Sequence, residues 1–248
     1  MFPTISIGHL VFPTTGLILI FGAWLCLTVI EKADTRLQLD VQKTYTLATV
    51  ALFAGFVGAR LTFVLQYWPA YQENLLGIIW PLTSGYNATG GLIVGVTVAF
   101  FYGRAHQLPP LATLDALTPG ILLGFMTVSL ADFLGGPGFG TLTAVPWGIS
   151  QYGLRRHPVQ LYEMLAGLLA LVVWWQMVER RKYEGQLFLT AVTIYSATRL
   201  FLDAFRDNAW LTANGYHLWQ IVSLGVMLVG LFLLTYFHET QTHSVQKT

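Results

Sequence analysis

Charge is what this sequence has least of. Only 10% of its 248 residues are Asp, Glu, Lys or Arg, whereas 54% are hydrophobic. So few charged side chains cannot cover the surface of a soluble protein of this length. The 13 Lys and Arg exceed the 12 Asp and Glu by only one, and without a surplus of cations to neutralise phosphates a nucleic-acid partner is not expected. The sequence therefore predicts a membrane protein.

Cysteine is almost absent as well. Cys26 is the only one, and it lies inside an apolar run, which excludes a disulfide framework and a metal site built from cysteines. We interpret Cys26 as a small buried hydrophobe and expect no metal and no other cofactor. No basic segment precedes the first apolar run and no small-residue cleavage site follows it, so we do not expect that run to be a cleaved signal peptide.

Seven apolar stretches are long enough, or nearly so, to cross roughly 30 Å of hydrocarbon as helices of about 20 residues. They lie near residues 10–30, 46–66, 89–103, 111–133, 158–178, 186–205 and 217–237. Pro, Gly and small polar residues crowd the stretch WPLTSGYNATGG before the short third segment, which indicates a loop that dips back into the protein. We predict an all-α membrane protein of about seven transmembrane helices, in which residues 1–248 form a single integral membrane domain.

The distribution of cations predicts the orientation. With the N-terminus outside, the inner segments carry eight of the 13 cations, namely Lys32, Arg36, Lys43, Arg104, Arg180, Arg181, Lys182 and Lys247. The outer segments carry Arg155, Arg156 and Arg206. We therefore predict an outer N-terminus, a cytoplasmic C-terminus, and re-entrant or glycine-rich loops on the outer side. The outer arginines run against the charge rule, which indicates that they have another role.

Several charged side chains fall within the predicted spans, where each costs about 2.5–3.5 kcal/mol unless it is paired or faces water. They are Arg60, Asp132, Glu163, Arg199 and Asp203. Arg199, Asp203 and Arg206 recur at spacings of four and three, which places a cation, an anion and a cation on one helix face. Two interpretations stay open: an ion-pair ladder that holds helices in register, or a binding site for an anion.

The fifth predicted span opens with an unusual number of polar residues. The stretch GLRRHPVQLYEM at 153–164 holds Arg155, Arg156, His157, Gln160, Tyr162 and Glu163. Snorkelling and an interfacial tyrosine explain single members of this set, but they explain six together poorly.

Two glycine-rich strings accompany these residues: LGGPGFGTL at 134–142 after the fourth span, and ATGGLIVG at 88–95, which places Gly90 and Gly91 at a helix N-terminus. Backbone N–H groups in such places bind anions, although close helix packing is the alternative role for membrane glycines. Outer arginines, glycine turns and a broken helix together predict a pocket for an anionic headgroup.

The order of these motifs resembles the prolipoprotein diacylglyceryl transferase family. The matching strings are SIGHL at 6–10, GARLTFVL at 58–65, GGLIVG at 90–95, the glycine turn ending at Gly140, VPWGI at 145–149, RHPVQLYE at 156–163, TRLFLDAFRDN at 198–208 and WQIVS at 219–223. The resemblance implies a multi-pass enzyme of the bacterial plasma (inner) membrane. Such an enzyme moves a diacylglyceryl group from phosphatidylglycerol to the lipobox cysteine thiol of a preprolipoprotein.

Some positions depart from the family pattern. Thr89 stands where the family has a histidine, Ser129 and Asp132 stand where it has an arginine and an asparagine, and Thr15 stands where it has a tyrosine. The implied reaction needs a thiolate, and an imidazole with its ordinary pKa of about 6.5 suits the role of base. With Thr89 in the histidine position, we predict that His157 is this base; its other interpretation is a hydrogen bond within the turn before Pro158.

We predict that Arg199 also acts in catalysis, by supporting the leaving glycerol phosphate. The residues predicted to contact the anionic phospholipid are Arg60, Asp132, Gly140, Arg156, Gln160, Tyr162, Glu163, Asp203 and Arg206. Asp132 stands in place of an asparagine, and a negative charge on its side chain would repel a phosphate in a site of low dielectric constant. A second function therefore stays open, that of a catalytically inactive homologue that binds phospholipid or assembles with a partner in a membrane complex.

Overall fold

The computed structural model describes residues 4–7, 10–73, 75–79, 85–151, 153–207 and 209–245. Its α-helices are α1 (Thr14–Leu37), α2 (Val41–Gln66), α3 (Trp68–Tyr71), α4 (Leu76–Ile79), α5 (Ala88–Ala105), α6 (Pro110–Gly135), α7 (Val159–Met177), α8 (Gln186–Leu202) and α9 (Leu218–Val245). Short 3-10 helices follow α7 and α8 as η1 (Val178–Arg180) and η2 (Asp203–Phe205). Two antiparallel hairpins complete the described part, β1 (Thr4–Ile7) with β2 (Leu10–Pro13) and β3 (Ile149–Gln151) with β4 (Leu154–Arg156).

Seven of the described helices are long and apolar enough to cross a membrane: α1, α2, α5, α6, α7, α8 and α9. The predicted all-α multi-pass membrane protein is thus confirmed. The predicted start of the first span was wrong, because residues 10–13 form strand β2 and the helix begins at Thr14. A short apolar run can form a strand as well as a helix, so hydrophobicity alone does not locate the residue at which the helix begins.

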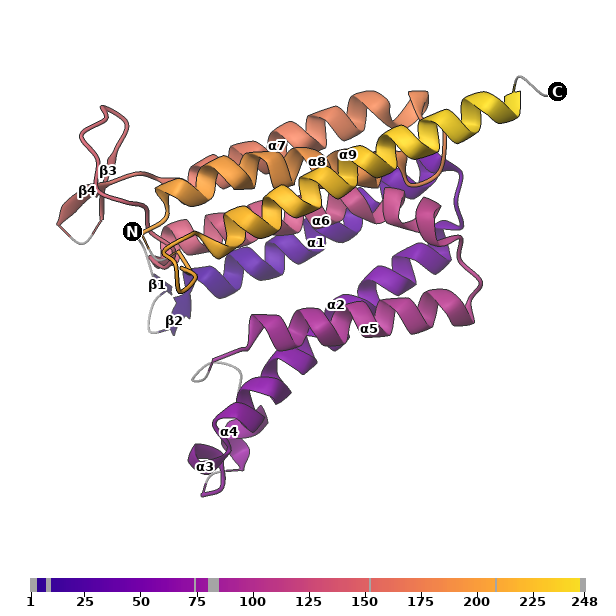
Figure 1. The fold of residues 1–248 in the computed structure, drawn as a ribbon. Coiled ribbons are helices and arrows are strands. Elements are labelled where there is room, and N and C mark those ends of the chain that lie inside the picture. The colour runs from indigo at the N-terminus through magenta and orange to yellow at the C-terminus, as the bar shows by residue number, and fades with distance from the viewer. Residues whose placement is uncertain are drawn as a thin grey trace. The chain divides into compact units, whose positions relative to one another are not determined.

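The chain forms two compact units, residues 1–37 with 114–248 (unit 1) and residues 38–113 (unit 2). In unit 2, α2 and α5 lie side by side (Figure 1). Their backbones approach so closely that a Cβ on Gly91 would lie 2.7 Å from the carbonyl oxygen of Gly55. Gly91 therefore serves close helix packing. Asn87 caps α5 by accepting a hydrogen bond from the N–H of Gly90 at 3.0 Å, as an N-cap side chain does.

In unit 1, α7, α8 and α9 are neighbours that alternate in direction (Figure 1). The start of α7, the end of α8 and the start of α9 therefore meet at one end, where the β3–β4 hairpin also lies. We call this end of unit 1 the hairpin end. Arg155 closes the hairpin, since it donates to the carbonyl oxygens of Gly148 at 3.2 Å and Pro146 at 2.6 Å.

The opposite end of unit 1 is anchored by a carboxylate that sequence analysis missed. Asp115 of α6 is fully buried and accepts hydrogen bonds from the backbone N–H groups of Gly185 and Phe188, both at 2.8 Å. The guanidinium of Arg181 lies 3.3 Å from the same carboxylate. A carboxylate that reaches the N-terminus of a helix accepts hydrogen bonds from its free N–H groups and interacts favourably with its dipole, so Asp115 ties α6 to the start of α8.

Candidate functional site

A buried carboxylate, Glu163, binds two arginines at the hairpin end. Glu163 lies one turn into α7 and its side chain is 5% exposed. Arg199, in the last turn of α8, donates to Glu163 Oε1. Arg206, which follows η2, donates through Nη2 to Oε1 at 2.7 Å and to Oε2 at 2.8 Å. Ser129 of α6 adds a hydrogen bond to Oε2 at 3.3 Å. We call these four residues the Glu163 cluster.

The Glu163 cluster shows how two of the three charged residues with helical spacing, Arg199 and Arg206, are paired. Both arginines bind one carboxylate on a neighbouring helix, so they hold α8 and α7 together. Asp203 has a different partner, since its Oδ2 lies 3.0 Å from Nδ1 of His217. The backbone changes from α-helix to the 3-10 helix η2 at Asp203, and the side chains of a 3-10 helix follow a different period.

The glycine turn packs between the chain before α7 and the chain after η2. Thr141 donates its N–H to the carbonyl oxygen of Phe205 at 2.8 Å and accepts from the N–H of His157 at 3.0 Å. A Cβ on Gly140 would lie 2.3 Å from the carbonyl oxygen of His157. Glycine is therefore required at position 140 by the close approach of two backbone segments.

Two further predicted residues bind this turn through its carbonyl groups. Arg156 donates to the carbonyl oxygen of Gly140 at 3.0 Å and forms an ion pair with Asp207 at 2.9 Å. Gln160 is fully buried, and its amide donates to the carbonyl oxygen of Pro137 at 2.9 Å. Within the described part of the chain, Gln160 Oε1 has no hydrogen-bond partner.

His157 takes part in a different network from Glu163. Its Nδ1 lies 3.2 Å from the hydroxyl oxygen of Tyr162, which also accepts a hydrogen bond from Nε1 of Trp147 at 2.8 Å. The His157 ring packs against Phe205, with 4.9 Å between ring centroids. The partner of the His157 ring is thus a tyrosine side chain of α7 rather than the turn before Pro158, and a catalytic role of His157 stays a prediction.

Asp132 stands on α6 beside the Glu163 cluster. Its carboxyl group lies close enough to Arg206 and Glu163 to interact with their charges, and its Oδ2 lies 3.9 Å from the position of a Cβ on Gly138. Gly138 has a φ of +71°, a conformation that suits glycine. Both departures from the family pattern on α6, Ser129 and Asp132, thus lie against the same buried charges.

Arg60 lies in unit 2, where it binds backbone carbonyl groups. It donates to the carbonyl oxygens of Ile78 at 2.9 Å and Gly85 at 3.0 Å, and to that of Gly77. These contacts join α2 to the segment that contains α4. Lipid contact by Arg60 stays a prediction. The matched string at 6–10 and the predicted re-entrant loop fall partly outside the described residues, at positions 8–9 and 80–84.

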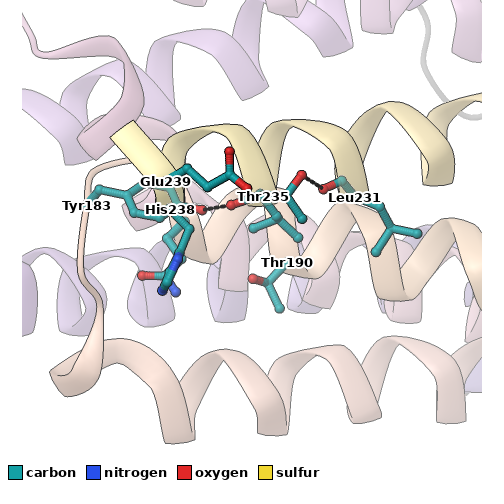
Figure 2. Close-up of a pocket in the computed structure, with 8 residues that line it drawn as sticks. Tyr183, Thr190, Leu231, Thr235, His238 and Glu239 are labelled. Carbon is teal, nitrogen blue, oxygen red and sulfur yellow. Dashed lines mark hydrogen bonds between the residues drawn. The ribbon is translucent and has the colours of Figure 1, made fainter. Parts of the chain in front are cut away.

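A pocket of about 400 Å³ lies between α8 and α9, near the end of unit 1 opposite to the hairpin (Figure 2). It is lined by Tyr183, Gln186, Thr190, Leu231, Leu234, Thr235, His238 and Glu239. Tyr183 donates to the carbonyl oxygen of Leu234 at 3.1 Å, and partial burial, with the nearby charge of Asp115, raises the pKa of Tyr183. The 13 residues from Gln186 to Arg199 span roughly 20 Å of helix, so this pocket is separate from the Glu163 cluster.

Sequence comparison places the chain among known proteins. The family model described as prolipoprotein diacylglyceryl transferase matches residues 3–236. The phosphatidylglycerol–prolipoprotein diacylglyceryl transferase of Clostridioides difficile is 25% identical over 232 residues, which cover 94% of this chain and 93% of that protein. The protein of the same name from Wolbachia pipientis subsp. Culex pipiens is 31% identical over 217 residues, which cover 79% and 81%. The predicted transferase class is thereby confirmed, and the chain belongs to the prolipoprotein diacylglyceryl transferase family.

Proposed function

We propose that this protein transfers a diacylglyceryl group from phosphatidylglycerol to the lipobox cysteine thiol of a prolipoprotein. The relatives are named for these two substrates. The observation that carries the proposal is the Glu163 cluster, in which Arg199 and Arg206 converge on one carboxylate next to a glycine turn. Two guanidinium groups that share one carboxylate offer an excess of positive charge to an anionic headgroup.

The reaction displaces a phosphate from carbon, so its transition state concentrates negative charge on the leaving oxygen. Arg199 and Arg206 would stabilise this charge, because fixed cations stabilise a developing anion best where water is excluded. Arg156, which binds the carbonyl oxygen of Gly140, would hold the headgroup from the other side of the turn. Gly140, Tyr162 and Glu163 shape the site through the contacts described above.

Complementation tests the proposal directly. A bacterial strain depleted of its own diacylglyceryl transferase should grow when it expresses this chain, and a lipobox peptide should gain the mass of a diacylglyceryl group in its membranes. A purified protein that binds phosphatidylglycerol but neither restores growth nor modifies the peptide would favour the inactive homologue with a partner in a membrane complex.

The effect of Asp132 on lipid binding is the first testable prediction. At an effective dielectric constant of about 20, a negative charge roughly 10 Å from a phosphate costs about 1.7 kcal/mol, which is more than tenfold in affinity. We expect Asp132→Asn to bind phosphatidylglycerol vesicles about tenfold more tightly and to transfer faster. Glu184→Gln, an exposed change of the same kind outside the cluster, should leave binding unaltered. Equal affinities of Asp132→Asn and parent would show that Asp132 puts no negative charge beside the phosphate.

Orientation in the membrane is the second prediction. We infer that the protein spans the bacterial plasma membrane with the hairpin end outside, because the sequence puts eight of the 13 cations in segments that are then predicted to lie inside. A fluorescent protein fused to the C-terminus should therefore fluoresce in the cytoplasm, and alkaline phosphatase fused there should be inactive. Active phosphatase at the C-terminus would reverse the orientation.

A further inference from the structure

A second histidine at the hairpin end, His217, is held by a buried carboxylate in an orientation that leaves one ring nitrogen able to accept a proton. His217 directly precedes α9, and its Nδ1 lies 3.0 Å from Oδ2 of Asp203. Asp203 is fully buried, whereas the His217 side chain is 27% exposed. A carboxylate only accepts hydrogen bonds, so this contact holds the imidazole proton on Nδ1 and leaves the lone pair on Nε2.

The pair of Asp203 and His217 belongs to the same end of unit 1 as the arginines. Asp203 lies in the chain between Arg199 and Arg206, and its carbonyl oxygen accepts the N–H of Arg206 at 3.2 Å. One turn into α9, Gln220 donates to the carbonyl oxygen of Leu200 at 3.1 Å. These contacts hold the start of α9 against the end of α8, so His217 stays beside the segment that carries both cations.

His157 is less suited to accept a proton. The indole N–H of Trp147 can only donate, so the oxygen of Tyr162 accepts it. The hydroxyl proton of Tyr162 then has Nδ1 of His157 as its acceptor, at 3.2 Å. In the neutral imidazole the other nitrogen carries the proton. This arrangement occupies the single lone pair of the neutral His157 imidazole.

We propose that His217 is the general base of the transfer and that Asp203 positions it, an inference that rests on the proposed function. Nε2 of His217 takes the proton of the lipobox thiol. The thiolate sulfur attacks the terminal glycerol carbon, a C–S bond forms, and the C–O bond to phosphate breaks with its electron pair on oxygen. The imidazolium, stabilised by Asp203 as an aspartate stabilises the histidine of a catalytic triad, then returns the proton to the glycerol phosphate.

The test compares two nucleophiles on the full-length protein with phosphatidylglycerol. One lipobox peptide carries the natural cysteine, and the other carries selenocysteine, which is already ionised at neutral pH and needs no base. His217→Gln keeps a hydrogen-bond donor for Asp203 but cannot accept a proton at neutral pH. We expect it to slow transfer to the thiol about 10²–10⁴-fold, while transfer to the selenol stays within about tenfold of the parent. Asp203→Asn should show the same selectivity, and the matched control His157→Gln should not.

The outcomes separate this inference from the proposed function. Parent protein that modifies the cysteine peptide, together with His217→Gln at an unchanged rate, would overturn the inference alone. Equal losses with thiol and selenol would also overturn it, because His217 would then act through structure. A thiol-selective loss in His157→Gln would assign the base to His157 instead. Parent protein inactive on both peptides would overturn the proposed function and the inference together.

Discussion

Replacing Glu163 by alanine is expected to lower the free energy of unfolding by about 3–5 kcal/mol and to abolish transfer. Removing one partner of a buried ion pair leaves the other uncompensated, and here two guanidinium groups lose their common carboxylate. Ser129 loses its acceptor as well. Because Arg199 and Arg206 also lose their fixed positions, the leaving phosphate loses the cations that support it.

The chain offers a matched control for this prediction. Glu179 pairs with Arg36 at 3.1 Å, but its side chain is 77% exposed. Exposed pairs contribute about 0–1 kcal/mol, so Glu179→Ala should change stability by less than about 1 kcal/mol and leave transfer intact. Thermal unfolding in detergent gives the stability of both variants, and the transfer assay gives their activity. Similar melting temperatures for the two would refute a structural role of the Glu163 cluster.

The seven spans could be predicted from the sequence because the signal for a membrane helix is local. About 20 apolar residues in a row identify such a helix without knowledge of its neighbours. Helix ends depend on finer features, which is why the span predicted at 10–30 was observed as α1 from Thr14 to Leu37. The helical stretch after Ile30 contains charged residues, among them the fully buried Asp34, so hydropathy alone ended the predicted span too early.

The partners within the site could not be predicted, because they lie far apart in the sequence. The spacing of Arg199 and Arg206 placed two cations on one face, but their shared partner, Glu163, is 36 and 43 residues away. Asp203 shares that spacing, but η2 begins at this residue and its side chain contacts His217, which precedes α9. His217 belongs to no motif, and its only sequence signal was a histidine at the start of an apolar span.

Family resemblance supplied what spacing could not, because it set together residues that lie far apart in the sequence. It brought the RHPVQLYE string together with the arginines that follow it, and the structure joins them at Glu163. It also placed Arg60 in the same set. In the structure Arg60 belongs to unit 2 and binds carbonyl groups there. Motif order thus predicted membership of the family, whereas the hydrogen-bond partners of each side chain followed only from the fold.

Replacing Gly140 by alanine is expected to lower the free energy of unfolding by about 1–3 kcal/mol and to slow transfer. The added Cβ would lie 2.3 Å from the carbonyl oxygen and 2.9 Å from the Cβ of His157, and 2.7 Å from Cγ2 of Val159. The first two atoms belong to or adjoin the backbone and cannot rotate away, so the turn must separate from the start of α7. Arg156 binds the carbonyl oxygen of Gly140, and Arg206 pairs with the same segment.

Both arginines would therefore shift when the turn moves, which is why transfer should fall by about tenfold or more. Gly225→Ala in α9 is the control, because a Cβ there would meet no atom within 4 Å. Alanine is favoured over glycine in a helix by about 1 kcal/mol, so this variant should be neutral or slightly more stable and fully active. If Gly140→Ala had the same stability and transfer rate as Gly225→Ala, the close packing of Gly140 against His157 would not restrict the side chain at position 140.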